Sequence, residues 1–130
     1  MASIRKTLEI DAPIEKIWAA LADYHNVHTR VAPGFVTDSK PEGDIRVLTF
    51  SNGSVAREKL VSLDEALHRL VYTIVDGRPT HHDASVDLTA LDGARTRFVW
   101  TTDVLPDELA PYIDGQMTLA VPLVKAALER

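Results

Sequence analysis

The 130-residue sequence contains no cysteine, which excludes disulfides, thiolate metal sites and a cysteine nucleophile. It also has no long apolar run. The longest, Leu119 to Val124, is far below the roughly 18 residues of a membrane-spanning helix. Basic residues are outnumbered, 14 Lys and Arg against 19 Asp and Glu, and the net charge of −5 argues against non-specific nucleic-acid binding. Residues 1–6 lead directly into an alternating pattern instead of the apolar run of a signal peptide. We therefore expect a soluble, cytoplasmic protein without nucleic-acid partners or membrane insertion.

The composition is that of an ordinary folded domain. Hydrophobic residues make up 45% and charged residues 25% of the chain, as in soluble globular proteins. The length suits one domain, and no linker, repeat or low-complexity segment divides it. The sequence predicts a single domain over residues 1–130.

The spacing of apolar residues changes within the first 30 residues, from the period of a strand to that of a helix. Residues 4–10 alternate apolar and polar side chains, as a half-buried strand does. Residues 13–21 place a proline in a first helical turn and then apolar side chains at helical spacing. Residues 25–30 favour a short second helix. This part predicts one strand followed by a helix pair.

The middle of the chain is a succession of short alternating segments with turn signals between them. The expected strands are residues 35–39, 45–51, 54–63, 67–75, 81–91 and 95–104. Asn52-Gly53, Asp76-Gly77 and Asp92-Gly93 are hairpin signals, because these residues tolerate positive φ at low cost. Consecutive hairpins predict an antiparallel meander, since parallel strands would need crossover helices.

Residues 107–130 return to helical period, with one apolar stripe along the segment. The predicted fold class is α+β: a curved antiparallel sheet of about seven strands wrapped around a long C-terminal helix, with the helix pair after the first strand. A single helix does not fill the concave side of such a sheet, and ligand pockets favour such places. We expect a cavity between the sheet and this helix.

The sequence resembles the START-like or SRPBCC superfamily, especially its bacterial polyketide cyclase and dehydrase-like branch. The resemblance covers the whole chain and is carried by residues 10–18 (IDAPIEKIW), 21–24 (LADY), 53–60 (GSVAREKL), 70–74 (LVYTI) and 96–100 (TRFVW). It implies a helix-grip fold, in which the sheet grips the C-terminal helix over a ligand cavity. It implies no single activity, because the superfamily holds lipid carriers, hormone receptors, cyclases, oxygenase domains and cochaperones.

Strand parity selects three polar candidates for the cavity wall. Glu58, Tyr72 and His82 each share a face with the apolar residues of their strand, and the resemblance implies that these positions point inward. An inward Glu58 would be desolvated unless a cation or hydroxyl pairs with it; the alternative is an exposed cross-strand pair. His82 could donate a hydrogen bond or carry a proton, or lie partly solvated at the cavity mouth. Tyr72 offers a ring with a hydroxyl, or is a core tyrosine.

Three further residues are apolar candidates for contact with a ligand. Trp100 lies on the bulkier face of the last strand, which we expect to face inward unless a bulge reverses it. Ile113 and Met117 lie on the apolar stripe of the C-terminal helix, where packing in the core is the alternative.

Metal and cofactor sites are not expected. His25 and His28 have the spacing of one helix face, but nothing places His81 and His82 opposite them, so we interpret the histidines as scattered. No nucleophile elbow and no glycine-rich phosphate loop occurs. Lys6 falls on the apolar side of the first strand, either extending to solvent or pairing with a ligand carboxylate or Glu58.

The sequence favours binding of a small hydrophobic, cyclic or aromatic metabolite in the cavity. A first alternative is an enzyme of the polyketide cyclase, aromatase or dehydratase type, in which Glu58 and His82 move protons. A second is a cochaperone-like interaction module with a filled core. The ligand, its conversion or carriage, and homodimer formation are left open by the residues.

Overall fold

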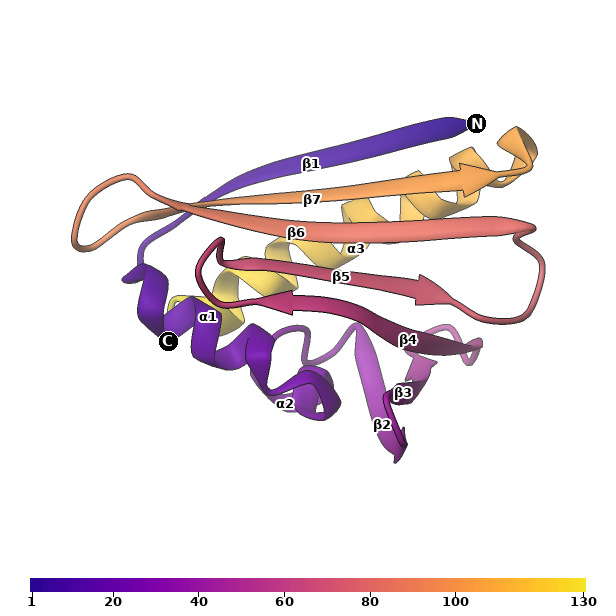
Figure 1. Ribbon diagram of the computed structural model, residues 1–130, viewed down its shortest axis with the longest axis horizontal. Helices are drawn as coiled ribbons and strands as arrows, with labels where there is room; N and C mark the ends of the chain where they lie inside the picture. The colour runs from indigo at the N-terminus through magenta and orange to yellow at the C-terminus, as the bar shows by residue number, and fades with distance from the viewer.

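The computed structural model describes residues 1–130, and an antiparallel sheet of seven strands dominates it (Figure 1). The order across the sheet is β1-β7-β6-β5-β4-β3-β2, so β1 pairs with β7 and every other strand pairs with its neighbours in sequence. The strands are β1 (Ala2–Ile10), β2 (Val36–Glu42), β3 (Ile45–Phe50), β4 (Val55–Asp64), β5 (Arg69–Ile74), β6 (His81–Ala90) and β7 (Thr96–Leu105). The predicted meander is confirmed.

The helices occupy the two places that the sequence predicts. Between β1 and β2 lie α1 (Ile14–Ala22), the 3₁₀ helix η1 (Tyr24–Asn26) and α2 (Val27–Arg30). After β7 come the 3₁₀ turn η2 (Asp107–Leu109) and the long α3 (Ala110–Leu128). None of the helices combines the length and the apolar character needed to cross a membrane.

The observed strand boundaries differ from the predicted ones by up to three residues, and two of these differences have a local cause. β2 continues through Pro41 to Glu42, because its turn contains only Gly43, at φ +64°, and Asp44. Pro41 is tolerated there because β2 is the edge strand. β5 begins two residues later than expected, because His68 adopts a positive φ of 51° and belongs to the preceding turn.

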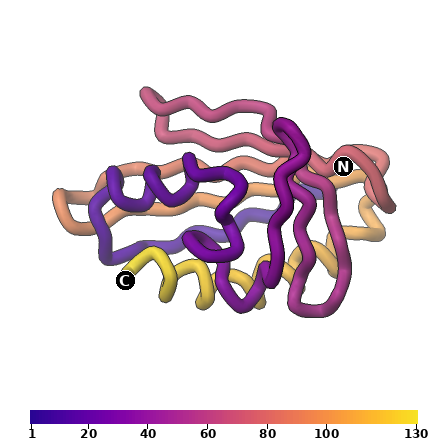
Figure 2. The backbone as a smooth tube through the Cα atoms, turned by 90° about the horizontal axis from the view of Figure 1, so that it is seen from below, coloured from indigo at the N-terminus to yellow at the C-terminus, as the bar shows by residue number.

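The sheet is strongly curved. In both views β2 and β3 run across the direction of β5, β6 and β7 (Figures 1 and 2). The helix α3 lies over the concave face of the sheet. Right-handed twist accumulates from strand to strand, and bulges in β2 and β4 add to it. The helix-grip arrangement predicted from the sequence is therefore present.

The core lies on the concave face of the sheet. Its cluster of 23 buried apolar residues joins the inward positions of the strands to α1, α2 and the C-terminal half of α3. From α3 only Ala120, Val124 and Leu128 belong to this cluster. The N-terminal half of α3 is therefore available to cover something other than this core.

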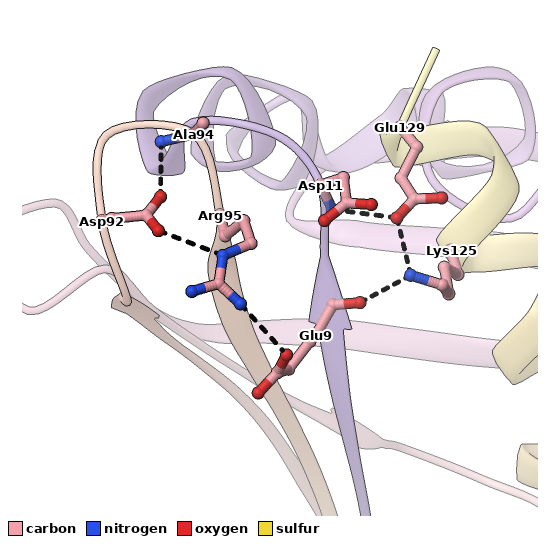
Figure 3. A network of polar contacts seen from close by, with 7 residues as sticks. All are labelled: Glu9, Asp11, Asp92, Ala94, Arg95, Lys125 and Glu129. Atoms are coloured by element: carbon pink, nitrogen blue, oxygen red, sulfur yellow. Dashed lines mark hydrogen bonds and ion pairs between the residues drawn. The ribbon is translucent and has the colours of Figure 1, made fainter.

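Polar contacts fix α3 to β1 at two levels. Near its end, Lys125 donates from Nζ to the carbonyl oxygen of Glu9 over 2.7 Å and pairs with Glu129, whose carboxylate accepts from the backbone N–H of Asp11 (Figure 3). Near its start, Lys6 pairs with Asp114. The helix is thus held along the β1 side of the sheet, and Lys6 is committed to α3 rather than to Glu58.

Candidate functional site in the cavity under the C-terminal helix

A cavity of about 400 Å³ lies between the sheet and the N-terminal half of α3. Its floor comes from β4 to β7 and includes Ala56, Glu58, Tyr72, Ile74, His82, Trp100 and Thr102. Its roof comes from η2 and α3 and includes Leu109, Tyr112, Ile113, Gln116 and Met117. The expected cavity is present, and all six residues proposed from the sequence line it; their contact with a ligand remains a prediction.

A second, smaller cavity of about 70 Å³ lies deeper, toward α1 and α2. The two cavities share five lining residues, namely Phe35, Phe50, Glu58, Tyr72 and Trp100. Four of these five are aromatic, so the junction between the two spaces is a wall of rings with one carboxylate in it.

That carboxylate, Glu58, is paired with a second buried charge. Arg46 lies directly opposite Glu58 in the β3–β4 ladder. Its Nε and Nη2 atoms both reach Oε1 of Glu58 at 3.0 Å. Arg46 is 5% and Glu58 is 6% exposed. Glu58 is therefore an inward carboxylate paired with a cation, which is the first of the two arrangements that the sequence allowed, and not an exposed cross-strand contact.

Two tyrosines brace the guanidinium. Its carbon lies 4.0 Å from the ring centre of Tyr24 and 4.9 Å from that of Tyr72, within the range of cation–π contact. Arg46 Nη1 also donates to the Tyr24 carbonyl oxygen over 3.1 Å, and Tyr24 Oη donates to the Glu58 carbonyl oxygen over 2.9 Å. These contacts hold the side chain of Arg46 in one orientation, and with it the carboxylate of Glu58.

The hydrogen bonds that the Glu58 carboxylate accepts all end on Oε1, which leaves Oε2 without a donor from the chain. Glu58 lines both cavities. A nearly buried acceptor facing a cavity costs free energy unless water or a ligand group donates to it. Oε2 therefore keeps the capacity to accept a hydrogen bond from water or from a ligand group.

Tyr72 contributes a hydroxyl beside this carboxylate. Trp100 Nε1 donates to Tyr72 Oη over 3.1 Å, so the oxygen acts as acceptor there and its own proton is available to another group. Burial raises the pKa of Tyr72 well above its usual range, and the nearby carboxylate of Glu58 acts in the same direction. The phenol consequently stays protonated and can donate into the cavity.

His82 contributes a second donor. Its Nδ1 atom accepts from the backbone N–H of Ile74 over 3.2 Å, which in a neutral ring leaves the proton on Nε2. The His82 ring lies 6.2 Å from that of Tyr72, centre to centre. Burial lowers the pKa of His82 below 6.5, although Glu58 opposes the shift. The neutral imidazole thus presents Nε2–H at the cavity wall.

The stability of the fold should fall as the pH is lowered from about 7 to 5. The pKa of His82 is lowered in the folded state, so below about 6.5 the unfolded chain binds a proton that the folded chain does not, and the free energy of unfolding decreases. Urea denaturation of His82→Asn should show a weaker decrease. His81→Asn, at the exposed neighbouring position, is the control and should keep the full decrease; equal curves for both variants would contradict the assignment.

Sequence reasoning missed Arg46 as well as the aromatic residues Phe35 and Phe50. Arg46 shares a strand face with Leu48 and Phe50, so alternation in β3 was a signal that it points inward. A charged residue on an apolar face is usually interpreted as an end extended toward solvent, and its role became apparent only with Glu58 opposite.

The histidines do not form a metal site. No group of three or more His, Cys, Asp or Glu side chains is placed to hold an ion. His25 and His28 lie on η1 and α2, while His81 and His82 begin β6. Two carboxylates line the larger cavity, Glu58 and Asp76, and each is paired with an arginine.

The architecture and the cavity together correspond to a known family. The model of the family described as polyketide cyclase / dehydrase and lipid transport matches residues 1–130. The chain belongs to this family. It is accordingly a START-like (SRPBCC) protein, as the sequence motifs indicated. A search of curated proteins gives no match.

Several solved structures share this fold. A protein from Thermobifida fusca is 26% identical, with a TM-score of 0.79, and the match covers 98% of this chain and 93% of that one. A START superfamily protein from Mycobacterium smegmatis is 16% identical, with a TM-score of 0.74 and coverage of 98% and 94%. Norcoclaurine synthase from Thalictrum flavum is 18% identical, with a TM-score of 0.77 and coverage of 98% and 84%.

Proposed function

We propose that this START-like protein binds a small hydrophobic ring compound in the cavity under α3. The observation that carries the proposal is a space of about 400 Å³ between the sheet and α3. Natural ligand sites are concave, mostly apolar and of a few hundred Å³ or more, with a small number of convergent polar groups. The cavity has these properties. A filled-core interaction module, the third interpretation of the sequence, would not.

The size and the walls of the cavity suggest the ligand class. A protein cavity of about 150 Å³ accommodates benzene, so about 400 Å³ suits a compound of two or three rings. Phe50, Tyr72 and Trp100 offer ring faces and edges for stacking. The norcoclaurine synthase structure holds dopamine and hydroxybenzaldehyde, two ring compounds, in a protein of this fold.

Filling the cavity should abolish most of this binding. Ala56 lies on the floor, and Ala56→Trp would place an indole in the space a ligand needs. Titration with naphthalene, followed by its fluorescence, should show at least about tenfold weaker binding than wild type, a loss of about 1.4 kcal/mol. Ala126→Trp, on the exposed face of α3, is the matched control. The proposal fails if both variants bind as wild type does or if wild type binds nothing.

An acid–base enzyme of the cyclase or dehydratase type is the second candidate. One specific observation favours it: a carboxylate oxygen without a protein donor, on Glu58, lines the same cavity as the neutral imidazole of His82. The two candidates differ in what Glu58→Gln changes. A cyclase would lose turnover while it still binds its substrate, whereas a carrier would change only in affinity.

A further inference from the structure

Three polar groups that line the larger cavity form a set whose hydrogen-bonding capacity is incomplete. Glu58, Tyr72 and His82 are each more than nine-tenths buried, and all three line the larger cavity. Each has one partner from the chain and one function left over: an acceptor on Glu58 Oε2, a donor on Tyr72 Oη and a donor on His82 Nε2. A ligand that matches them must both donate and accept hydrogen bonds at one place.

The strand register brings these groups together. Glu58 pairs with Ile74, and Tyr72 is two residues before Ile74 on the same face of β5, which makes Glu58 and Tyr72 diagonal neighbours. His82 binds the N–H of that same Ile74 from the other side. One acceptor, on Glu58, and two donors, on Tyr72 and His82, thus lie around Ile74 of β5.

The charges of Glu58 and Arg46 disfavour a charged ligand group at this place. The Glu58 carboxylate is already neutralised by Arg46 at 3.0 Å. A ligand ammonium would bring a second buried cation beside Arg46 and leave the donors on Tyr72 and His82 without an acceptor. A ligand carboxylate would place two anions side by side and offer Oε2 no proton.

We propose that the ligand of this cavity carries an uncharged hydroxyl, alcohol or phenol, that donates to Glu58 Oε2 and accepts from Tyr72 or His82. The hydroxyl is the smallest neutral group that does both. The proposal rests on the proposed ligand-binding function and adds the chemical class of the ligand, a hydroxylated ring compound, and the residues that select it.

A series of three probes tests the proposal in the wild-type protein. Naphthalene, 2-naphthol and 2-naphthoate share one ring system and differ in the polar group. Isothermal titration calorimetry at neutral pH should give at least about tenfold tighter binding of 2-naphthol than of naphthalene, because a hydrogen bond to a charged group is among the stronger ones. 2-Naphthoate should bind at least about tenfold more weakly than 2-naphthol.

Two variants test which residues cause the preference for 2-naphthol over naphthalene. Glu58→Gln should reduce the ratio of naphthol to naphthalene affinity to less than about threefold, since an uncharged amide replaces the acceptor. It also leaves Arg46 without its carboxylate. Tyr72→Phe, which preserves the charge pair and the ring, should reduce the same ratio and serves if Glu58→Gln does not fold.

The outcomes distinguish the hydroxyl proposal from the proposed ligand-binding function. Equal affinities of naphthalene and 2-naphthol in wild type would overturn the hydroxyl proposal and leave the ligand-binding function standing. Tighter binding of 2-naphthoate than of 2-naphthol would also overturn it. Failure of all three probes to bind would contradict the proposed function itself, and the hydroxyl proposal with it.

Discussion

Arg46→Met should destabilise the fold by about 3–5 kcal/mol, the range expected when one partner of a buried ion pair is removed. The side chains of Arg46 and Glu58 are only 6% and 8% exposed. Without the guanidinium, the carboxylate of Glu58 would have neither a cation nor a donor from the chain. Tyr24 and Tyr72 would also lose the cation stacked between them. Urea denaturation of the purified variant measures the change.

Two further variants distinguish a charge effect from a packing effect. Arg69→Met removes a cross-strand pair with Asp87 on exposed side chains and should cost only a small fraction of that loss, because water screens such pairs. Arg46→Met combined with Glu58→Leu removes both charges and should recover most of the stability, since an apolar pair of similar volume avoids the desolvation cost. A loss from Arg46→Met no larger than that from Arg69→Met would contradict this assignment.

Leu48→Ala should be the second severe variant, with an expected loss of about 3–5 kcal/mol, in the upper part of the range for such truncations. Leu48 is 2% exposed and lines the smaller cavity. β3 is paired on both sides, by β2 and by β4, so the backbone cannot move inward to close the new space. The variant would merely enlarge an existing void.

Leu119→Ala is the matched control for this variant. Leu119 lies on the outer face of α3 and is 61% exposed, so its truncation should change stability by about 0.5 kcal/mol or less. Comparison of the urea midpoints at equal slopes gives the difference between the two leucines. A loss at Leu48 as small as that at Leu119 would mean that the core around the smaller cavity can collapse.

The fold was predictable because its signals are local. Alternation within each strand, glycine-containing turns between strands and the period of residues 107–130 each specify one element and its neighbour. The inward positions of Glu58, Tyr72 and His82 follow from the same alternation. Trp100 also faces inward, as the alternation predicts, because β7 pairs with β6 and β1 without a bulge.

The partner of Glu58 was not predictable, because it depends on a register shift of one residue. Asn52-Gly53 predicts a two-residue hairpin, which would place Arg46 opposite Lys59. In the structure Phe50 N–H donates to the Ser54 carbonyl oxygen across a three-residue loop, with Gly53 at φ +86°. This loop moves Arg46 to the position opposite Glu58.

The volume of the cavity could not be predicted from the sequence either. The apolar stripe of α3 predicts that the helix covers the sheet, but not how closely its N-terminal half approaches it. That spacing depends on contacts between distant segments, such as those of Lys125 with Glu9 and of Lys6 with Asp114. Packing of this kind is a property of the whole fold and is not encoded in the local pattern.

The central claim, a ligand in the cavity under α3, is tested most directly by the two tryptophans. Trp100 lines both cavities and donates to Tyr72, whereas Trp18 is buried outside them, edge-on to His68. In a ¹⁵N-edited NMR titration with 2-naphthol, the indole N–H signal of Trp100 should move until saturation while that of Trp18 stays in place. A Trp100 signal that does not move, or equal movement of both signals, would contradict the account.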